Sequence, residues 1–349
     1  MNDTDIIKTK IEKYLHSRLF FRKRAKKLLK KGEKFRGLSK IQKMSLGLNN
    51  MVYSITINIQ KKVRTQREYI LRVYPDNEND FKPKKEYRRH NELTNYDIPS
   101  AKVHVFENDI ERIGNRFMIL DKLEGVSVQE KIKDFTNEET KEFLSSLAMY
   151  LGHLHSHRSK KFEYSFPKNA IAQKVSFPEY ILMEVHEYIR SFSELLLDKE
   201  YKVDTHYVFK WIEGHKPLLN ISKFSLIHGD VRPSNIIVEK NKITGLIDWE
   251  MSSYSDPAWD IGWSLFFFKL YDNLKQNRDF FFSEYWSACE KYDIEARVYF
   301  YEFLAALKIT TYAYSVKKYN SEKYKAHSDF FTRVLKIFPK YVSTITHKD

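Results

Sequence analysis

Hydrophobic and polar residues alternate with a period of two along residues 41–74, which is the pattern of β-strands. The stretch IQKMSLGLNNMVYSITINI leads into the charged segment KKVRTQRE, where a turn is expected, and YILRVYP completes a β-hairpin. Two further strands are expected in VHVFEND and RFMILDKL, and residues 81–96 have the pattern of a helix. The first part of the chain is therefore predicted to be a small lobe of five short strands around one helix.

The pattern changes to a helical period from Gly125 onward. The long helical segments are TNEETKEFLSSLAMYLGHLHSH, FPEYILMEVHEYIRSFSELLL and VYFYEFLAALKITTYAYSVKKY. Residues 224–248 interrupt them with two short apolar runs, NIIVEK and ITGLID, on either side of a turn at Asn241. The second part is predicted to be mostly helical, with one small hairpin that carries polar residues at both ends.

The beginning of the chain is strongly basic. Residues 1–40 hold 14 Lys and Arg against 4 Asp and Glu, which accounts for most of the formal net charge of +14. Within residues 18–36, Phe21, Ala25, Leu28 and Leu29 recur at helical spacing among the basic residues. We therefore expect residues 1–40 to be a basic helical extension. It is either a solvated cap on the first lobe or a surface for nucleic acid, an anionic membrane or an acidic partner.

Cysteine usage and hydropathy exclude several classes of protein. Cys289 is the single cysteine, so the chain has neither an internal disulfide nor a multi-cysteine zinc site. The N-terminus lacks the layout of a secretory signal, and the most apolar run, residues 263–268, is far shorter than the roughly 20 residues that span a bilayer. We expect a cytoplasmic protein.

The strongest chemical signal is HGDVRPSN, from His228 to Asn235, followed by LIDWE at residues 246–250. Phosphoryl transfer needs a carboxylate that accepts the proton of the acceptor hydroxyl, oxygen ligands for magnesium, and cations for the phosphates. Asp230 and Asn235 lie five residues apart in one loop, and Asp248 ends a strand-like run. Carboxylate and amide oxygens are the ligands that Mg²⁺ prefers. These residues together predict a magnesium site suited to phosphoryl transfer.

This order of motifs resembles the aminoglycoside phosphotransferase and choline kinase superfamily, whose members are distant relatives of protein kinases. The loop keeps the spacing of the kinase catalytic loop, with Gly229 in place of its Arg. The resemblance implies an α+β, two-lobed protein-kinase-like fold, with the N-lobe at residues 41–124 and the C-lobe at residues 125–349. It also implies that Asp230 is the catalytic base and that Asn235 and Asp248 bind magnesium.

The resemblance assigns supporting and nucleotide-binding roles as well. The segment SDPAWDIGW implies that Asp260 braces the catalytic loop through backbone hydrogen bonds, with His228 as a structural residue. The nucleotide-binding residues that it implies are a loop over the phosphates, a strand Arg with its Glu partner, and two backbone positions at the adenine hinge. They are Gly47, Asn49 and Asn50, then Arg72 and Glu86, then Asp121 and Leu123.

Several polar and aromatic residues allow two readings. Arg232 either contacts the transferred phosphate or is an exposed cation. Three tryptophans, Trp249, Trp259 and Trp263, either form an aromatic box for a cationic substrate or pack in the core. Two acidic residues, Glu250 and Asp256, either meet such a substrate or hold their loop. The three histidines His153, His155 and His157 suggest metal ligands by spacing, but packing is the preferred interpretation.

The prediction is an ATP- and Mg²⁺-dependent phosphotransferase that acts on a hydroxyl of a small molecule. An amino alcohol such as choline is ranked first as the acceptor, and an aminoglycoside or another antibiotic is the alternative. From another class, the alternative is a catalytically silent nucleotide-binding scaffold that docks on RNA or a membrane through residues 18–36.

Overall fold

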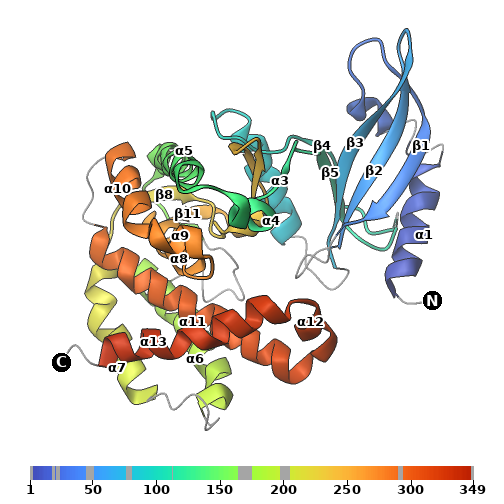
Figure 1. Cartoon of the computed structure of the whole chain (residues 1–349). Helices are drawn as coiled ribbons and strands as arrows, with labels where there is room; N and C mark the ends of the chain where they lie inside the picture. Colours follow the sequence, from blue (N-terminus) through green and yellow to red (C-terminus); the bar gives the residue numbers. More distant parts are fainter. Residues whose placement is uncertain are drawn as a thin grey trace. The chain divides into compact units, whose positions relative to one another are not determined.

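The computed structural model of the chain describes residues 3–17, 20, 24–44, 51–75, 81–111, 113–163, 175–196, 205–289 and 294–346. The chain divides into two compact units, Met1–Gly125 with Thr244–Glu250 and Val126–Ile243 with Met251–Asp349. The first unit is rich in strands and the second is mostly helical, which confirms the predicted α+β class (Figure 1). The expected boundary near residue 125 is present, but Thr244–Glu250 groups with the first unit instead of the second.

The first unit is built on an antiparallel five-stranded sheet in the order β1-β2-β3-β5-β4. The strands are β1 (Lys34–Lys43), β2 (Met51–Gln60), β3 (Arg64–Val73), β4 (Val103–Glu107) and β5 (Phe117–Asp121). Its helices with described bounds are α1 (Asp3–Leu15) and α3 (Phe81–Leu93), with a 3₁₀ turn η1 at Ala25–Leu28. Five strands were predicted, but most of KKVRTQRE, expected as a turn, belongs to β3.

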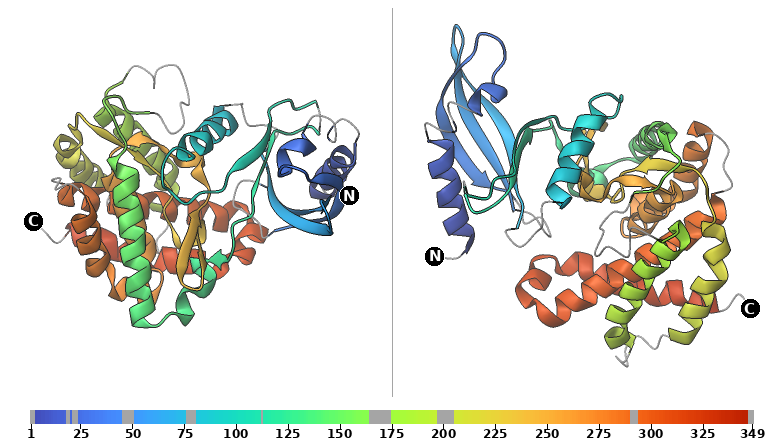
Figure 2. Two further views of the ribbon diagram at one scale, coloured as in Figure 1. Left: turned by 90° about the horizontal axis from the view of Figure 1, so that it is seen from above. Right: turned by 180° about the vertical axis from the view of Figure 1, so that it is seen from behind.

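Alternation along β2 produces the core of this sheet. Tyr53, Ile55 and Ile57 point to one face because successive side chains of a strand project to opposite faces. Their partners on β3 include Leu71 opposite Tyr53 and Tyr69 opposite Ile55, and both are buried in the same cluster. The α-helix α1 lies along this sheet in all three views (Figures 1 and 2).

The predicted basic helix does not extend over the whole of residues 18–36, part of which lies outside the described residues. Of the described residues in that stretch, Phe20 is helical, Ala25–Leu28 form the short turn η1, and β1 begins at Lys34. Phe20, Ala25 and Leu28 are buried in the sheet's core beside residues of α1, and the Tyr69 hydroxyl donates to the Leu28 carbonyl. Tertiary burial of these apolar residues therefore overrides their helical spacing. Residues 1–40 are part of the first unit, and a separate extension is not formed.

The second unit contains the three long helices that were predicted, as α5 (Asn137–Ser156), α6 (Phe177–Leu196) and α11 (Glu295–Tyr319). Its other helices of at least four residues are α4 (Val128–Lys131), α7 (Thr205–His215), η4 (Lys216–Leu219), α8 (Ala258–Phe268), α9 (Asp272–Gln276), α10 (Arg278–Ala288), α12 (Ser321–Ala326) and α13 (Ser328–Thr346). Thr136 caps α5, since its hydroxyl accepts from the Glu139 amide while the Glu139 carboxylate accepts from the Thr136 amide.

The predicted hairpin is present as β9 (Ile236–Glu239) and β10 (Lys242–Leu246). Lys240 and Asn241 join the strands with φ of 49° and 63°, the left-handed backbone that a two-residue turn between twisted strands requires. Short strands complete two three-stranded sheets, β10-β9-β6 and β11-β8-β7. They are β6 (Val126–Ser127), β7 (Arg158–Ser159), β8 (Phe224–Ile227) and β11 (Ser253–Ser255).

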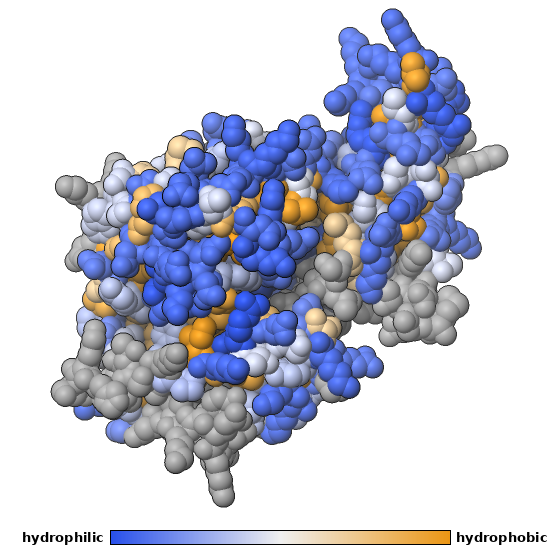
Figure 3. Space-filling view, in the orientation of Figure 1, coloured by the Kyte–Doolittle hydropathy of each residue, from blue (hydrophilic) through white to orange (hydrophobic). Residues whose placement is uncertain are grey.

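Hydrophilic side chains cover most of the described surface in one view of the molecule, and apolar side chains gather only in small separate places (Figure 3). The exposed large apolar residues, such as Val63, Met149 and Tyr319, are scattered along the chain. In the described part of the chain, no helix combines the length and the apolar character that crossing a bilayer demands.

Candidate functional site

The predicted catalytic loop follows β8 in the second unit and ends in a 3₁₀ turn, η5 (Pro233–Asn235). Gly229 has a φ of 85°, and a Cβ at this position would lie 2.6 Å from the carbonyl oxygen of Met251. Only glycine satisfies both the left-handed backbone and this close approach. The Arg that protein kinases carry here is therefore sterically excluded from this loop.

Asp260, at the beginning of α8, braces this loop as predicted. Its two carboxylate oxygens accept from the amides of His228 and Gly229, each at 2.8 Å. The sequence interpretation missed the support behind Asp260. The Nε2 atom of buried His155 lies 3.2 Å from Asp260 Oδ2, and its Nδ1 atom shares a 2.8 Å hydrogen bond with the Tyr285 hydroxyl. His155 is thus part of the brace, and only its position in the tertiary structure shows this.

The carboxylate of Asp230 is held on both sides. Trp263 Nε1 donates to its Oδ1 at 2.9 Å, while Asn235 Nδ2 donates to its Oδ2 at 2.8 Å. Arg232 forms an ion pair with the same Oδ2, with Nε 3.1 Å away. The Asp230 amide donates to His228 Nδ1 at 3.2 Å, which makes His228 a structural residue of the loop. These contacts fix the direction in which Asp230 presents its charge.

The orientation of Asn235 suits a magnesium ligand. Its Nδ2 atom donates to both the carbonyl and the carboxylate of Asp230, at 2.9 and 2.8 Å. The Oδ1 atom is therefore on the other side of the amide, where it accepts a long 3.4 Å hydrogen bond from Ser234. An amide oxygen directed away from the neighbouring carboxylate is a donor that Mg²⁺ accepts.

Arg72 gathers three carboxylates in the first unit. Its Nη2 atom donates to Asp248 Oδ1 at 2.7 Å and to Glu250 Oε2 at 2.8 Å, and its Nε atom lies 3.3 Å from Glu86 Oε2. The predicted ion pair with Glu86 is thus present. Burial by itself would lower the pKa of Arg72, but Asp248 and Glu86 raise it well above its ordinary value. Arg72 is charged at every physiological pH.

Three of the five residues predicted to face the substrate have other contacts. Trp249 is fully buried and donates from Nε1 to the Leu246 carbonyl. Asp256 is also fully buried, with Arg297 Nε 2.7 Å from its Oδ2, so it holds the chain instead of meeting a ligand. Burial raises the pKa of Asp256 although Arg297 opposes the change. The Glu250 carboxylate accepts a hydrogen bond from Arg72. These contacts match the other interpretation, in which Trp249 packs in the core and Glu250 and Asp256 hold their loop.

Trp259 and Trp263 form an aromatic stack in the second unit, with ring centroids 5.6 Å apart and an interplanar angle of 16°. The ammonium group of Lys308 lies over both rings, 5.6 and 5.4 Å from their centroids, and 5.1 Å from the ring of Tyr188. The predicted aromatic box therefore consists of Trp259, Trp263 and Tyr188, without Trp249, and it holds a cation of the protein itself.

The predicted nucleotide-binding segments are described only in part. Gly47, Asn49 and Asn50 lie outside the described residues. At the predicted hinge the Asp121 amide donates to the Lys102 carbonyl at 3.0 Å, so this donor is not available to adenine. Leu123 packs over Gly245, and within the described part of the chain its own amide and carbonyl make no backbone hydrogen bond. The predicted contact of Leu123 with adenine stays a prediction.

The histidines of α5 do not form a metal site. Among the described residues, no group of three or more His, Cys, Asp or Glu side chains is arranged to hold an ion. His155 is buried in the brace of Asp260, whereas the His153 side chain is exposed. The packing interpretation therefore holds for His155.

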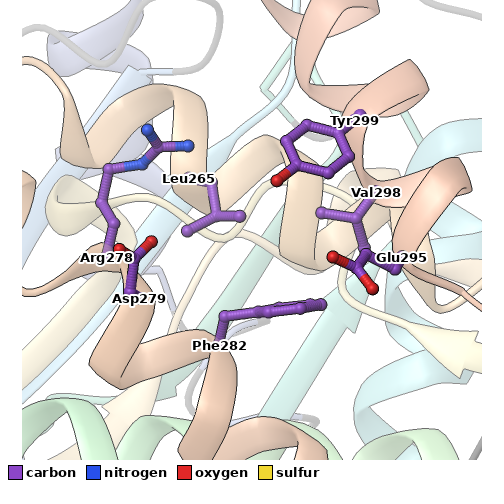
Figure 4. Close-up of a pocket in the computed structure, with 7 residues that line it drawn as sticks. All are labelled: Leu265, Arg278, Asp279, Phe282, Glu295, Val298 and Tyr299. Atoms are coloured by element: carbon purple, nitrogen blue, oxygen red, sulfur yellow. The ribbon is translucent and has the colours of Figure 1, made fainter.

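A small pocket in the second unit lies away from the predicted chemistry. Side chains of α8, α10 and α11 line it, with Leu265, Phe282 and Val298 facing one another between the charged groups of Arg278, Asp279 and Glu295 (Figure 4). None of the predicted site residues is among those that line it. Arg278 is occupied by Glu302, whose two carboxylate oxygens lie 2.7 and 2.9 Å from its Nη2 atom.

The fold and the braced loop define a protein-kinase-like phosphotransferase, and comparisons with known proteins agree. The profile of the phosphotransferase enzyme family matches residues 50–290, more than half of the chain, so this chain belongs to that family. An uncharacterized protein of Bacillus subtilis (strain 168), YcbJ, is 40% identical over 52 residues, which cover 15% of this chain and 16% of that protein.

Solved structures of low identity share the fold. A provisionally assigned aminoglycoside phosphotransferase of Ralstonia eutropha JMP134 superimposes with a TM-score of 0.58 at 13% identity, over 98% of both chains. A thermostable mutant of the aminoglycoside phosphotransferase APH(4)-Ia, in a ternary complex with ADP and hygromycin B, has a TM-score of 0.55 at 14% identity, over 87% of this chain and 95% of that one.

Proposed function

We propose that this chain transfers the γ-phosphoryl group of ATP to a hydroxyl of a small molecule. The observation that carries the proposal is the Asp230 carboxylate, which Trp263 and Asn235 hold from opposite sides in a loop that Asp260 braces. Such fixed orientation is what a general base needs, because it must meet the acceptor hydroxyl at hydrogen-bond distance. The family, and a structural neighbour bound to ADP, support ATP as the donor.

Asp230 orients the acceptor hydroxyl and accepts its proton as the phosphoryl group transfers. Arg72 neutralises the α- and β-phosphates, and Glu86 holds it in position. Asn235 and Asp248 offer oxygens to Mg²⁺, which screens the phosphate charge when it is bound. Arg232 is placed beside Asp230 as the cation for the transferred group. The loop of residues 47–50 over the phosphates and the cytoplasmic location both stay predictions.

The proposed acceptor is a small molecule with a hydroxyl group. Choline and other amino alcohols, and aminoglycosides as the alternative, stay predictions. The aromatic rings that would have bound an ammonium group already lie against Lys308. Both compound classes therefore enter the test together with sugars, polyols and nucleosides.

The proposal is tested by ADP release from Mg-ATP across this panel of acceptors. Asp230→Asn should lower acceptor-dependent turnover by about 10²- to 10⁴-fold, the contribution of a positioned general base. Asp134→Asn, at an exposed position in the same unit, should keep the wild-type rate. Wild-type turnover in a folded Asp230→Asn variant would overturn the assignment. Mg-ATP binding without turnover of any acceptor would favour the scaffold alternative.

A further inference from the structure

The aromatic stack beside Asp230 is fixed by the catalytic loop itself. Trp259 and Trp263 lie four residues apart on α8, so their side chains share one face of the helix. Trp259 Nε1 donates to the Gly229 carbonyl at 3.1 Å, and Trp263 Nε1 donates to Asp230 Oδ1 at 2.9 Å. An acceptor that places its hydroxyl at Asp230 must therefore also lie near the Trp263 ring.

A second helix supplies the charge at this stack. α11 packs closely on α8, since a Cβ at Gly262 would lie 2.6 Å from the Val298 carbonyl oxygen. Lys308 extends from α11 over the two tryptophan rings and the ring of Tyr188 from α6. A ring face attracts a cation through its quadrupole, so three rings from two helices stabilise the ammonium group there.

Two cations therefore flank the region around Asp230. Arg232 forms an ion pair with the Asp230 carboxylate, and Lys308 occupies the ring faces that an incoming ammonium group would use. A second positive charge near these groups would be repelled, and the repulsion is strong where side chains are partly removed from water. An uncharged group of the same shape meets no such electrostatic penalty.

We infer that Lys308, held over Trp259, Trp263 and Tyr188, is a specificity residue that selects acceptors without a positive charge next to the reacting hydroxyl. This inference rests on the proposed function. It excludes quaternary amino alcohols and polycationic antibiotics as preferred acceptors of the wild-type chain. Uncharged polyols, sugars and other neutral hydroxyl compounds are the class that remains.

The experiment compares binding of choline with binding of its uncharged isostere, 3,3-dimethylbutan-1-ol, to the full chain by ligand-observed NMR. Wild type should bind the isostere at least tenfold more tightly than choline. Lys308→Met should reverse this preference, because the emptied ring faces now accept the trimethylammonium group. Lys308→Arg retains the cation and should keep the wild-type preference. Thermal unfolding of each variant verifies that it is folded.

A further variant locates the binding. Trp259→Leu in the Lys308→Met background should remove the gained affinity for choline. The inference is overturned if wild type prefers choline, if Lys308→Met leaves the ratio of affinities unchanged, or if neither compound binds either protein. The readout needs no phosphoryl transfer, so it is independent of the ADP-release assay. A failure of the proposed function can therefore be distinguished from a failure of this inference.

Discussion

At the scale of single residues, the catalytic loop depends on a glycine whose role is steric. His228 and Gly229 present their amides to Asp260, and this geometry requires the left-handed backbone at Gly229. The same residue lies against the backbone of Met251, where no side chain fits. The motif HGD was recognised from the sequence, but the reason for its glycine is visible only in the contacts.

Gly229→Ala should destabilise the protein and reduce turnover together. A residue with a side chain in the left-handed region costs about 1–3 kcal/mol, and displacement of the Met251 backbone adds to this. The measurement is urea unfolding combined with the ADP-release assay. Gly214→Ala is the matched control, because a Cβ at this position in α7 meets no atom within 4 Å. It should be neutral or slightly stabilising. Equal effects of the two substitutions would contradict the steric argument.

At the scale of elements, the basic N-terminal segment is part of the first unit and not a separate helical extension. Its apolar residues follow helical spacing, yet they enter the core of the five-stranded sheet from α1, from the 3₁₀ turn η1 and from β1, a strand of that sheet. Arg67 on β3 holds Glu33 through two hydrogen bonds, at 3.0 and 2.7 Å, which ties this segment to the sheet. The lysines and arginines of this segment therefore belong to a folded lobe.

Leu28→Ala should lower the free energy of unfolding by about 2–5 kcal/mol, as is typical when a buried leucine is truncated. Leu28 is 1% exposed in the sheet's core, whereas its neighbour Lys27 is exposed. Lys27→Ala should change stability by no more than about 0.5 kcal/mol. Chemical denaturation followed by tryptophan fluorescence and circular dichroism distinguishes the two. A neutral Leu28→Ala would mean that this segment is a dispensable cap after all.

At the scale of the whole molecule, we expect a buried carboxylate to contribute to the loss of folding stability at acid pH. Glu86 is 1% exposed and accepts from the Tyr74 hydroxyl at 2.6 Å while it faces Arg72. Burial by itself would raise its pKa, but Arg72 lowers it below the ordinary value of 4.5. The folded state therefore favours the ionised carboxylate more than the unfolded state does.

This contribution of Glu86 is fully present above about pH 4.5, the pKa of an unfolded glutamate, and is lost as the pH falls through the lower pKa of the folded state. Glu86→Gln should lower stability at pH 7 and weaken its dependence on pH in the acid range. Urea unfolding from pH 7 to pH 3 measures both. Glu111→Gln, at an exposed position of the same unit, should retain the wild-type dependence. An unchanged acid slope in Glu86→Gln would refute the assignment.

The sequence by itself determined most strands of the first unit, the three long helices and the small hairpin of the second, and the residues of the braced loop. Local patterns specify these features: the period of apolar residues, the turn at Asn241, and the spacing of Asp230, Asn235 and Asp260. Only the tertiary structure decided how the described residues of 18–36 fold and that Trp249 and Asp256 are buried. It also decided the roles of His155 and Lys308. Apart from Trp249, which donates to the nearby Leu246 carbonyl, these depend on partners far away in the chain, such as Tyr69, Arg297, Tyr285 and Trp263. Spacing along one chain encodes which face a residue occupies, but not which distant side chain it will meet there.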